Sequence, residues 1–499
     1  MGSENKQARP IAEDEGRMMF LEKTICEVAG ITDQERAQLS KLVDVFNAHE
    51  GKNRLKNKYY EGNVTLREVN LGIALPDTFL NLEVGCEWGA KTVDVLASRS
   101  IFDGFVGKNG EDANTMQKIL EDNRLLSEYA KACKDELKYG CTFATLSADP
   151  VIGCRIRFHS PATASALWDG EAGRIGCGLS ILDTVRDEML KGEYRPALIR
   201  FDTPQDVLIL RRNDNIWTVE RQPHRMGRPL MEPMIWNATP AKPFGRSRLK
   251  KPIRELIKGY VRTIANATIG LEFATSPQKY LLGVTDEQYD AVVSNKFRQY
   301  VGSILAATTN PETGEEPRFG QLQQGSIGPH VEMVRLLATQ FSAATGLSVT
   351  DTGVVNDANP TSSDAILAQS QTLVLMAEQL NASNGDSLRT IAMMAQAIVR
   401  ETTLDGLTDE ERDVVAHFKN PAMPSVSMTA DAAVKIASAR QDFASTDIFL
   451  EMIGFDQADI RRIRAQEQRS RGTRVLTEEF ADDSNARLGE IYRPAEENQ

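Results

Sequence analysis

The sequence predicts an α+β fold, with helices and strands mixed in its first half and mainly helices in its second. Between residues 141 and 219, short apolar runs recur at roughly ten-residue spacing, which is typical of an antiparallel sheet. From residue 247 onward, apolar side chains recur with helical spacing in several long segments. These two patterns together indicate an α+β chain with an extended helical part.

Composition fits a soluble globular protein, because 41% of the 499 residues are hydrophobic and 26% are charged. The length allows two or three domains. No apolar run reaches the roughly 18 residues needed to span a bilayer, and the first residues lack the apolar stretch of a signal peptide, so we expect a cytosolic protein without membrane contact. The six cysteines show no C-x-x-C spacing and are expected to be buried free thiols.

The balance of charge disfavours a protein that binds nucleic acid tightly. Lys and Arg number 58 and Asp and Glu 70, which gives a net charge of −12. A surface of this sign repels phosphates. It is compatible with a passage through which DNA slides, because a strongly basic surface would hold the phosphates through counterion release.

In the N-terminal half we expect amphipathic helices that pack on one side of a single antiparallel sheet. The helices are predicted at 33–48, 82–97 and 112–138, and the strands at 101–105, 141–146, 155–159, 178–182, 196–201, 206–210 and 216–219.

In the middle of the chain the pattern predicts two helices separated by a small mixed segment. The first is expected to begin at the capping residue Ser247, and the second to end at Gly346. Between them, about 275–328, we expect a strand, a short helix at 286–300 and a strand-turn-strand whose turn is at 310–314.

The last part is predicted to be helical. A polar loop, Ser348 to Ser363, leads into a long helix from Ala365 to Arg400 that we expect to be interrupted at Asn381–Gly385. An extended segment at 417–428 follows, and then helices at 432–443, at 446–452 after the cap Ser445, and at 456–468.

The order and lengths of these segments resemble the portal proteins of tailed bacteriophages, in particular the siphovirus-like portal family. The resemblance rests on the Phe244-Gly245-Arg246-Ser247 lead-in, the two helices around the mixed segment, Thr345-Gly346-Leu347, and the loop into a Ser-Ser-Asp-Ala helix. It implies an N-terminal arm and α+β wing (1–243), a stem helix (244–273), a small α/β clip (274–327), a second stem helix (328–346), a tunnel loop (347–363), a spine helix with a wing strand (364–429), and a helical crown with an acidic tail (430–499).

The resemblance further implies a homo-oligomeric ring, expected to be a dodecamer, at one capsid vertex of the virion. Double-stranded DNA would pass through it without sequence-specific binding during packaging and ejection. The implied partners are the terminase large subunit, the major capsid and scaffolding proteins and a head-completion adaptor, with assembly in the bacterial host cytoplasm. The alternative is a cytosolic scaffold or adaptor that binds proteins only and has no role with DNA.

Candidate channel residues come from the loop, which contains Asp351 and Asp357 but no Lys or Arg. The resemblance places this loop around the channel, where carboxylates would repel phosphates and keep the duplex centred. A plain exposed linker is the other interpretation. The candidate residues are Ser348, Thr350, Asp351, Asn356, Asp357 and Asn359.

Two basic clusters are candidate contact sites. Lys250, Arg254, Lys258 and Arg262 recur every four residues and form one ridge of the first stem helix. This basic ridge is either a solvated face with ion pairs, or a ring interface, a DNA phosphate track or a docking surface for the packaging motor. The second is a crown cluster, which is either solvated or paired with the acidic tail of another subunit, or else contacts DNA inside the capsid. It consists of Arg461, Arg462, Arg464, Arg469 and Arg471.

Enzymatic signatures are absent from the sequence. Gly85–Thr92 has a superficial likeness to a phosphate-binding loop, but Ala90 stands where the second glycine is required, so we expect this segment to be helix surface. The five histidines show no metal-ligand spacing, and no serine stands in a G-x-S-x-G turn. We therefore expect no catalysis, no metal and no cofactor.

Overall fold

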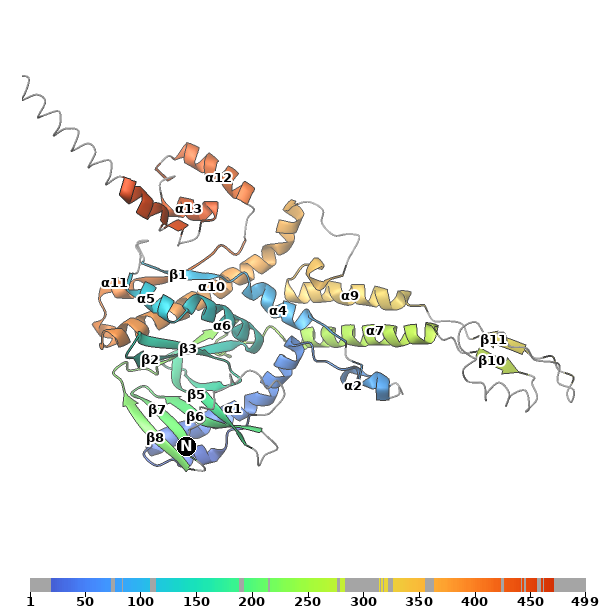
Figure 1. Cartoon of the computed structure of the whole chain (residues 1–499), viewed down its shortest axis with the longest axis horizontal. Helices are drawn as coiled ribbons and strands as arrows, with labels where there is room; N and C mark the ends of the chain where they lie inside the picture. Colours follow the sequence, from blue (N-terminus) through green and yellow to red (C-terminus); the bar gives the residue numbers. More distant parts are fainter. Residues whose placement is uncertain are drawn as a thin grey trace, which may run out of the picture.

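A computed structural model shows a mixed body from which a pair of helices projects, with a small helical unit on another side (Figure 1). The α+β character is confirmed at this level. The residues that the structure describes are 19–72, 77–82, 84–107, 114–187, 193–213, 216–275, 279–282, 314, 316, 318–321, 326–354, 363–422, 426–440, 442–443, 446–455, 459–460 and 462–470.

The strands of the body form two antiparallel sheets rather than the single predicted one. The larger sheet has the order β4-β5-β6-β7-β8, and the smaller has the order β3-β2-β9. The strands are β2 (Cys141–Asp149), β3 (Gly153–His159), β4 (Ala164–Asp169), β5 (Arg174–Asp187), β6 (Glu193–Asp202), β7 (Asp206–Asn213), β8 (Ile216–Pro223) and β9 (Met231–Ile235). Each strand pairs with a neighbour in an antiparallel register.

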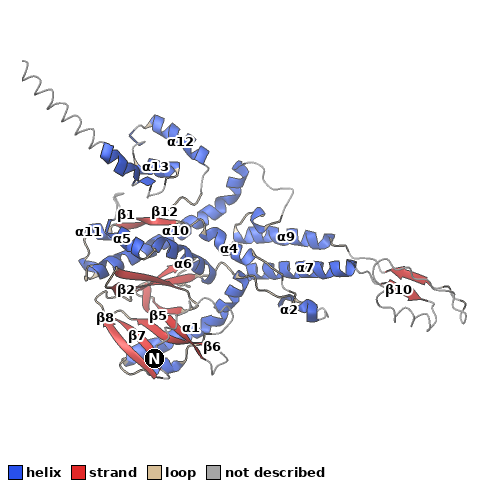
Figure 2. Ribbon diagram, in the orientation of Figure 1, coloured by secondary structure: helices blue, strands red, loops and turns tan. Residues whose placement is uncertain are grey.

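The two sheets pack face to face, and helices cover both outer faces (Figure 2). Phe143 of β2 and Met231 of β9 share a buried cluster with Ile175 of β5. A short 3-10 helix (η2, Lys23–Glu27) and α1 (Asp33–Tyr60) pack on the larger sheet, where Leu42 lies against Phe201 in one cluster. Since α6 (Leu125–Tyr139) and α10 (Ser363–Val399) contact the smaller sheet, the expectation of helices on one side only is wrong.

Several helix bounds differ from those that the periodicity predicts. α1 continues to Tyr60, where Tyr59 is buried and Asn53 donates a hydrogen bond to the carbonyl of Pro161 (3.0 Å). The predicted helix at 112–138 is two helices, α5 (Asn114–Asp122) and α6, because Arg124 between them adopts a left-handed conformation with φ 50°. α4 begins at Trp88 and ends at Ala97, and the short helices α2 (Leu66–Val69) and α3 (Asp77–Leu80) precede it.

The predicted interruption of the long helix is also wrong, because the backbone of α10 stays helical through Asn381–Gly385. The polar residues there are docking contacts. The Asn384 amide donates to the Glu136 carboxyl (2.8 Å) and the Tyr129 hydroxyl (3.0 Å), and Asn381 accepts from Ser100 (2.6 Å). Burial raises the pKa of Glu136 to about 8. Residues that would suggest a break in an exposed helix therefore anchor this buried one.

The projecting pair consists of α7 (Lys251–Thr275) and α9 (Gly328–Thr345), which lie side by side, with β10 (Lys279–Leu282) and β11 (Arg318–Gln321) paired antiparallel at their far end (Figure 1). α9 ends at Gly346 as predicted, with φ 75°. Ser247 is not the cap of α7, which begins four residues later. Its hydroxyl donates to the carbonyl of Lys138 (2.5 Å) instead. The helix expected at 286–300 and residues 310–313 of the expected turn lie outside the described residues.

The C-terminal part has a two-stranded sheet and further helices. β1 (Phe102–Gly107) pairs with β12 (Val414–Phe418), which follows the one-turn helix α11 (Asp409–Arg412). The extended segment expected to reach residue 428 ends earlier, since α12 spans Val426–Ala439. α13 (Asp447–Ile453) is capped by Thr446, whose hydroxyl accepts from the Phe449 amide, and not by Ser445.

All six cysteines are buried free thiols, as predicted from the sequence. Among the described helices, none combines the length and the apolar character that a membrane span requires.

Candidate functional site: the base of the projecting helices

Trp88, the first residue of α4, joins both projecting helices at their base. Its ring stacks on Phe341 of α9 (centroids 4.6 Å apart) and contacts Tyr260 of α7 (4.5 Å), and only 3% of the residue is exposed. The indole Nε1 donates a hydrogen bond to the carbonyl of Thr352 (3.1 Å) in η5 (Thr350–Thr352), a short 3-10 helix that follows α9. One side chain thus contacts α7, α9 and the start of the loop. We call this cluster the base junction.

Arg248 is a second anchor at the base of the projecting helices. It is 6% exposed, and its guanidinium donates to the carbonyls of Thr92 (2.6 Å) and Thr345 (2.8 Å) and contacts the sulfur of Met376 (3.3 Å). The Thr345 carbonyl is in the last turn of α9, where helix carbonyls lack a partner within the helix. Burial lowers the pKa of Arg248 to about 10, which still leaves the side chain charged at neutral pH. Arg248 therefore ties the end of α9 to α4 and α10.

The backbone conformation favours a glycine at position 346, because φ is 75°, in the left-handed region. A Cβ atom added there would lie 2.5 Å from Cε of Met376, the flexible end of a side chain that would have to move aside. The left-handed conformation thus marks the point at which the chain leaves α9 for the loop.

Side chains of α4 hold the first turn of the predicted tunnel loop through hydrogen bonds to its backbone carbonyls. Lys91 donates from Nζ to the carbonyl of Asp351 (2.6 Å), beside the Trp88 contact to Thr352. The Asp351 carboxylate accepts from the amide (3.0 Å) and hydroxyl (2.7 Å) of Ser348, so it stabilises the turn locally. The Ser348 hydroxyl also contacts that of Thr350 (2.6 Å). Asn356, Asp357 and Asn359 lie outside the described residues.

The basic ridge lies partly against its own chain. Arg254 is positioned over the ring of Tyr59 at the end of α1 (5.8 Å to the centroid), and Lys258 forms an ion pair with Glu255 (3.0 Å). Lys250 is exposed and Arg262 is half-buried. The ridge therefore combines stacking on α1, a local ion pair and a remaining accessible part.

Described members of the crown cluster pair with nearby carboxylates. Arg464 contacts Asp447 of α13 (2.6 Å) and Glu467 (2.9 Å), and Arg462 contacts Asp459 (3.6 Å). Arg469 is exposed and has an interaction of its own, and Arg461 and Arg471 lie outside the described residues. These ion pairs lie within the chain and do not involve the acidic tail. The predicted pairing with the tail of another subunit and the predicted DNA contact both remain proposals.

Sequence reasoning missed most of the base junction. It interpreted Gly85–Thr92 as helix surface, whereas Trp88 is buried and a Cβ atom on Gly89 would lie 1.8 Å from the Tyr59 carbonyl. A tryptophan and a lysine three residues apart at a helix start were the available signal, but their partners are distant in sequence. Arg248 carried no signal beyond its place in the lead-in.

The contacts of the base junction indicate a structural role. Its contacts are aromatic stacking and hydrogen bonds to backbone carbonyls, which fix positions and move no protons or electrons. Within the described ranges, no three His, Cys, Asp or Glu side chains come together as a metal site would require.

Two packed helices project from an α+β body and are fixed to it at their base. This arrangement is that of a structural protein subunit. The family described as phage portal protein, SPP1 Gp6-like, matches residues 31–473, and the chain belongs to this family. Its role is that of a phage portal protein. No curated protein matches the chain in sequence.

Distantly similar solved structures come from gene transfer agent (GTA) particles. The virion of the native GTA particle has a chain with 10% identity and a TM-score of 0.42, and the match covers 74% of this chain and 89% of that one. A chain from the neck of the native particle, computed with C12 symmetry, has 11% identity and a TM-score of 0.44, and the match covers 74% of this chain and 90% of that one. A chain from the neck of the empty particle, computed with C6 symmetry, has 11% identity and a TM-score of 0.43, and the match covers 71% of this chain and 87% of that one.

Proposed function

We propose that this portal protein assembles into a closed ring, of about a dozen subunits, that forms the DNA channel at one vertex of a phage capsid. Double-stranded DNA passes through it during packaging and ejection without being bound tightly. The ring is assembled in the host cytoplasm and remains in the virion. The family match supports the portal role, and the surface of the projecting helices supports assembly.

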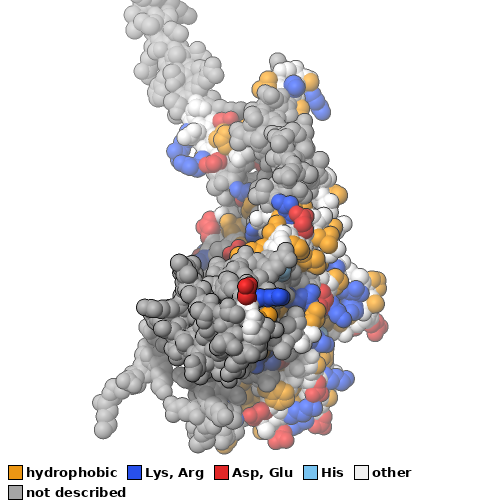
Figure 3. Space-filling model, turned by 90° about the vertical axis from the view of Figure 1, so that its right-hand side faces the viewer, with side chains coloured by type: hydrophobic (Ala, Val, Ile, Leu, Met, Phe, Trp, Pro, Cys, Tyr) orange, Lys and Arg blue, Asp and Glu red, His pale blue; other side chains and the backbone are white. Residues whose placement is uncertain are grey.

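The observation that carries the ring is an apolar surface on the projecting pair. Val331 (46% exposed), Met333 (38%) and Leu336 (51%) of α9, with Leu271 (45%) of α7, are exposed although the helices extend away from the body. Figure 3 views the molecule from the projecting end, where grey atoms cover the centre, and hydrophobic side chains lie among charged ones on the part of the face that remains visible. Exposed apolar side chains along two helices that project into solvent are suited to contacts between subunits. Copies of the chain arranged around an axis would cover them.

The ring is tested by native mass spectrometry and negative-stain electron microscopy of the purified protein. We expect rings with a central hole, and fewer rings for Leu336→Asp, because a carboxylate in the contact would be desolvated. Val151→Asp, the same kind of change at a valine that is 83% exposed in the turn between β2 and β3, is the control and should assemble normally. Particles without an axial hole, or monomers and dimers even with scaffolding protein present, would favour the alternative of an adaptor that binds proteins only.

Within the ring we propose that residues 247–273 and 329–345 flank the channel and that residues 274–327, which include β10 and β11, dock the terminase large subunit and later the head-completion adaptor. The body would contact the major capsid and scaffolding proteins. The basic ridge would lie near a ring interface or the motor docking surface, and the crown cluster would face the capsid interior. β10 and β11 lie at the far end of the projecting pair, which suits a docking role.

For the tunnel loop we propose that carboxylates repel the DNA phosphates and keep the duplex centred. Asp357→Lys should reduce the DNA content of particles while leaving rings intact, because an added cation would attract the passing phosphates. Asp351→Asn is the companion variant, since it keeps a side-chain oxygen that can accept from the amide and hydroxyl of Ser348 but removes one negative charge of the loop, so it tests charge with the turn retained. Normal genome content in Asp357→Lys particles would contradict the proposal.

A further inference from the structure

A cavity of about 320 Å³ opens in the body where α1, the β4–β5 hairpin and residues 227–229 meet. Apolar side chains form part of its wall, among them Trp168, Ile175 and Pro229. Three cationic side chains, Lys41, Arg174 and Arg228, line the rest, together with the polar Gln38 and the carboxylate of Asp169. The cavity thus combines an apolar wall with a positive one.

Cationic side chains are in excess in the cavity lining, with three of them against the single carboxylate of Asp169. The Asp169 carboxylate accepts hydrogen bonds from the backbone amides of Glu171 (3.0 Å) and Ala172 (3.1 Å), so it is used in the hairpin turn. Lys41 is exposed, and neither it nor Arg174 forms an ion pair with a described residue. Arg174 donates from Nη2 to the carbonyl of Gly227 (3.2 Å). In a chain whose net charge is −12, this is a local cationic site.

Arg228 supplies an unused donor. It is 9% exposed, its Nη2 is hydrogen-bonded to Glu232, and its Nε has no hydrogen-bond partner among the described residues. A buried guanidinium N–H without an acceptor is unfavourable, so the described residues do not fully satisfy the Arg228 side chain that lines the cavity. Burial raises the pKa of Glu232 to about 7, and the ion pair with Arg228 opposes this shift.

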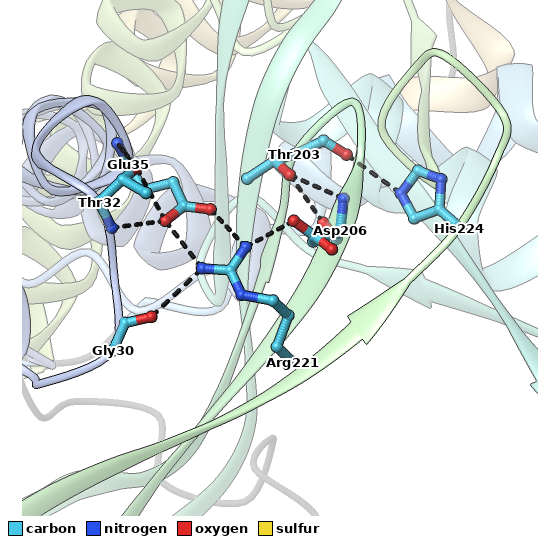
Figure 4. A network of polar contacts seen from close by, with 7 residues as sticks. All are labelled: Gly30, Thr32, Glu35, Thr203, Asp206, Arg221 and His224. Carbon is cyan, nitrogen blue, oxygen red and sulfur yellow. Dashed lines mark hydrogen bonds and ion pairs between the residues drawn. The ribbon is translucent and has the colours of Figure 1, made fainter.

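A polar network joins α1 to β7 and β8 (Figure 4). Arg221 of β8 contacts Glu35 of α1 (2.8 Å) and Asp206 of β7 (2.5 Å). Thr203 and Asp206 close the turn that contains Pro204 of the cavity wall. His224, which precedes residues 227–229, contacts the Thr203 carbonyl (3.2 Å). The turn that carries Pro204, one part of the cavity wall, is therefore held by contacts within the chain.

We propose that this cavity binds an acidic peptide segment of a protein partner, with a Glu or Asp side chain at the arginines and an apolar neighbour against Trp168. The apolar wall would be of no use to a free inorganic anion. A DNA duplex presents its phosphates on a convex surface, which does not enter a cavity of this size. A carboxylate at the end of a side chain reaches inside and meets both kinds of wall.

The test is isothermal titration calorimetry at low ionic strength with the peptide N-acetyl-Leu-Glu-Leu-Glu-amide as the probe. Binding should weaken by about fivefold to tenfold in Lys41→Gln/Arg174→Gln, as expected for two partly exposed charge contacts. The control Lys52→Gln/Arg54→Gln changes the net charge equally at exposed positions of α1 outside the cavity and should bind as the unmodified protein does. Circular dichroism of each variant confirms folding.

Each other outcome overturns the proposal. Equal binding of N-acetyl-Leu-Gln-Leu-Gln-amide would show that charge plays no part. Displacement of the probe by inorganic phosphate at the same concentration would define a general oxyanion site, and displacement by a short DNA duplex would define a nucleic-acid contact. Absence of binding to the unmodified protein would remove the site. Ring formation enters none of these measurements, so failure of the assembly proposal leaves this test intact.

Discussion

Replacing Trp88 should loosen the base junction in two separable ways. Trp88→Ala removes a buried indole that contacts Tyr260 and Phe341, and loss of a large core side chain typically costs about 3–5 kcal/mol of unfolding free energy. Trp88→Phe keeps an aromatic ring but removes the N–H that donates to Thr352. A buried carbonyl left without its partner costs about 1–3 kcal/mol, so we expect a smaller loss.

The assay is urea unfolding followed by circular dichroism, combined with hydrogen–deuterium exchange. In Trp88→Phe, residues 348–354 should exchange faster while α7 and α9 stay protected, because only the contact to η5 is lost. In Trp88→Ala, the ends of α7 and α9 should exchange faster as well. Phe20→Ala is the control, since Phe20 is 65% exposed and its loss should change stability by less than about 0.5 kcal/mol.

Two results would refute the reasoning about Trp88. If Trp88→Ala cost less than about 1 kcal/mol, the ring would not be packed between the projecting helices as described. If Trp88→Phe destabilised the protein as much as Trp88→Ala, the hydrogen bond and not the stacking would dominate the base junction.

Three further predictions concern other sites. Gly346→Ala should lower the unfolding free energy by about 1–2 kcal/mol, because φ 75° and the contact with Met376 oppose a side chain, and Gly270→Ala, with open space around it, is the comparison in urea unfolding. Glu136, whose folded pKa of about 8 exceeds its ordinary 4.5, stabilises the fold at low pH, and that contribution is lost as the pH rises toward 8, so Glu136→Gln should flatten the pH dependence of unfolding in this range. Glu35, whose pKa is lowered to about 2 chiefly by Arg221, contributes above pH 4.5, and the contribution is lost as the pH falls toward 2. Glu35→Gln should therefore remove stability near pH 7 and weaken its acid dependence, whereas an unchanged acid transition would contradict the pairing.

The elements that local pattern alone determines were predictable. α9 stops at Gly346 because glycine accepts the left-handed conformation there, and α7 and α10 show the apolar spacing of helices with a buried face. The split into two sheets was not predictable, since β9 pairs with β2 across a long stretch of chain and nothing local in Met231–Ile235 specifies that partner.

The candidate site was harder to predict for the same physical reason. The burial of Trp88 depends on rings in α7 and α9, and Asn384 is helical because Glu136 and Tyr129 meet it inside the body. In each case the local sequence favours one environment and the tertiary contact supplies another. Asp351 of the tunnel loop shows the converse case. Its carboxylate accepts a hydrogen bond from the nearby Ser348 hydroxyl, a local role that the charge pattern of the loop does not predict.

The way α4 holds η5 has an evolutionary consequence. Lys91 and Trp88 recognise main-chain oxygen atoms of Asp351 and Thr352, and every amino acid presents such an oxygen. Substitutions in this turn can therefore accumulate without releasing it, whereas the two donors on α4 are under stronger selection. Among descendants of a common ancestor, we expect an indole and a long cation at these positions to persist while the anchored turn drifts.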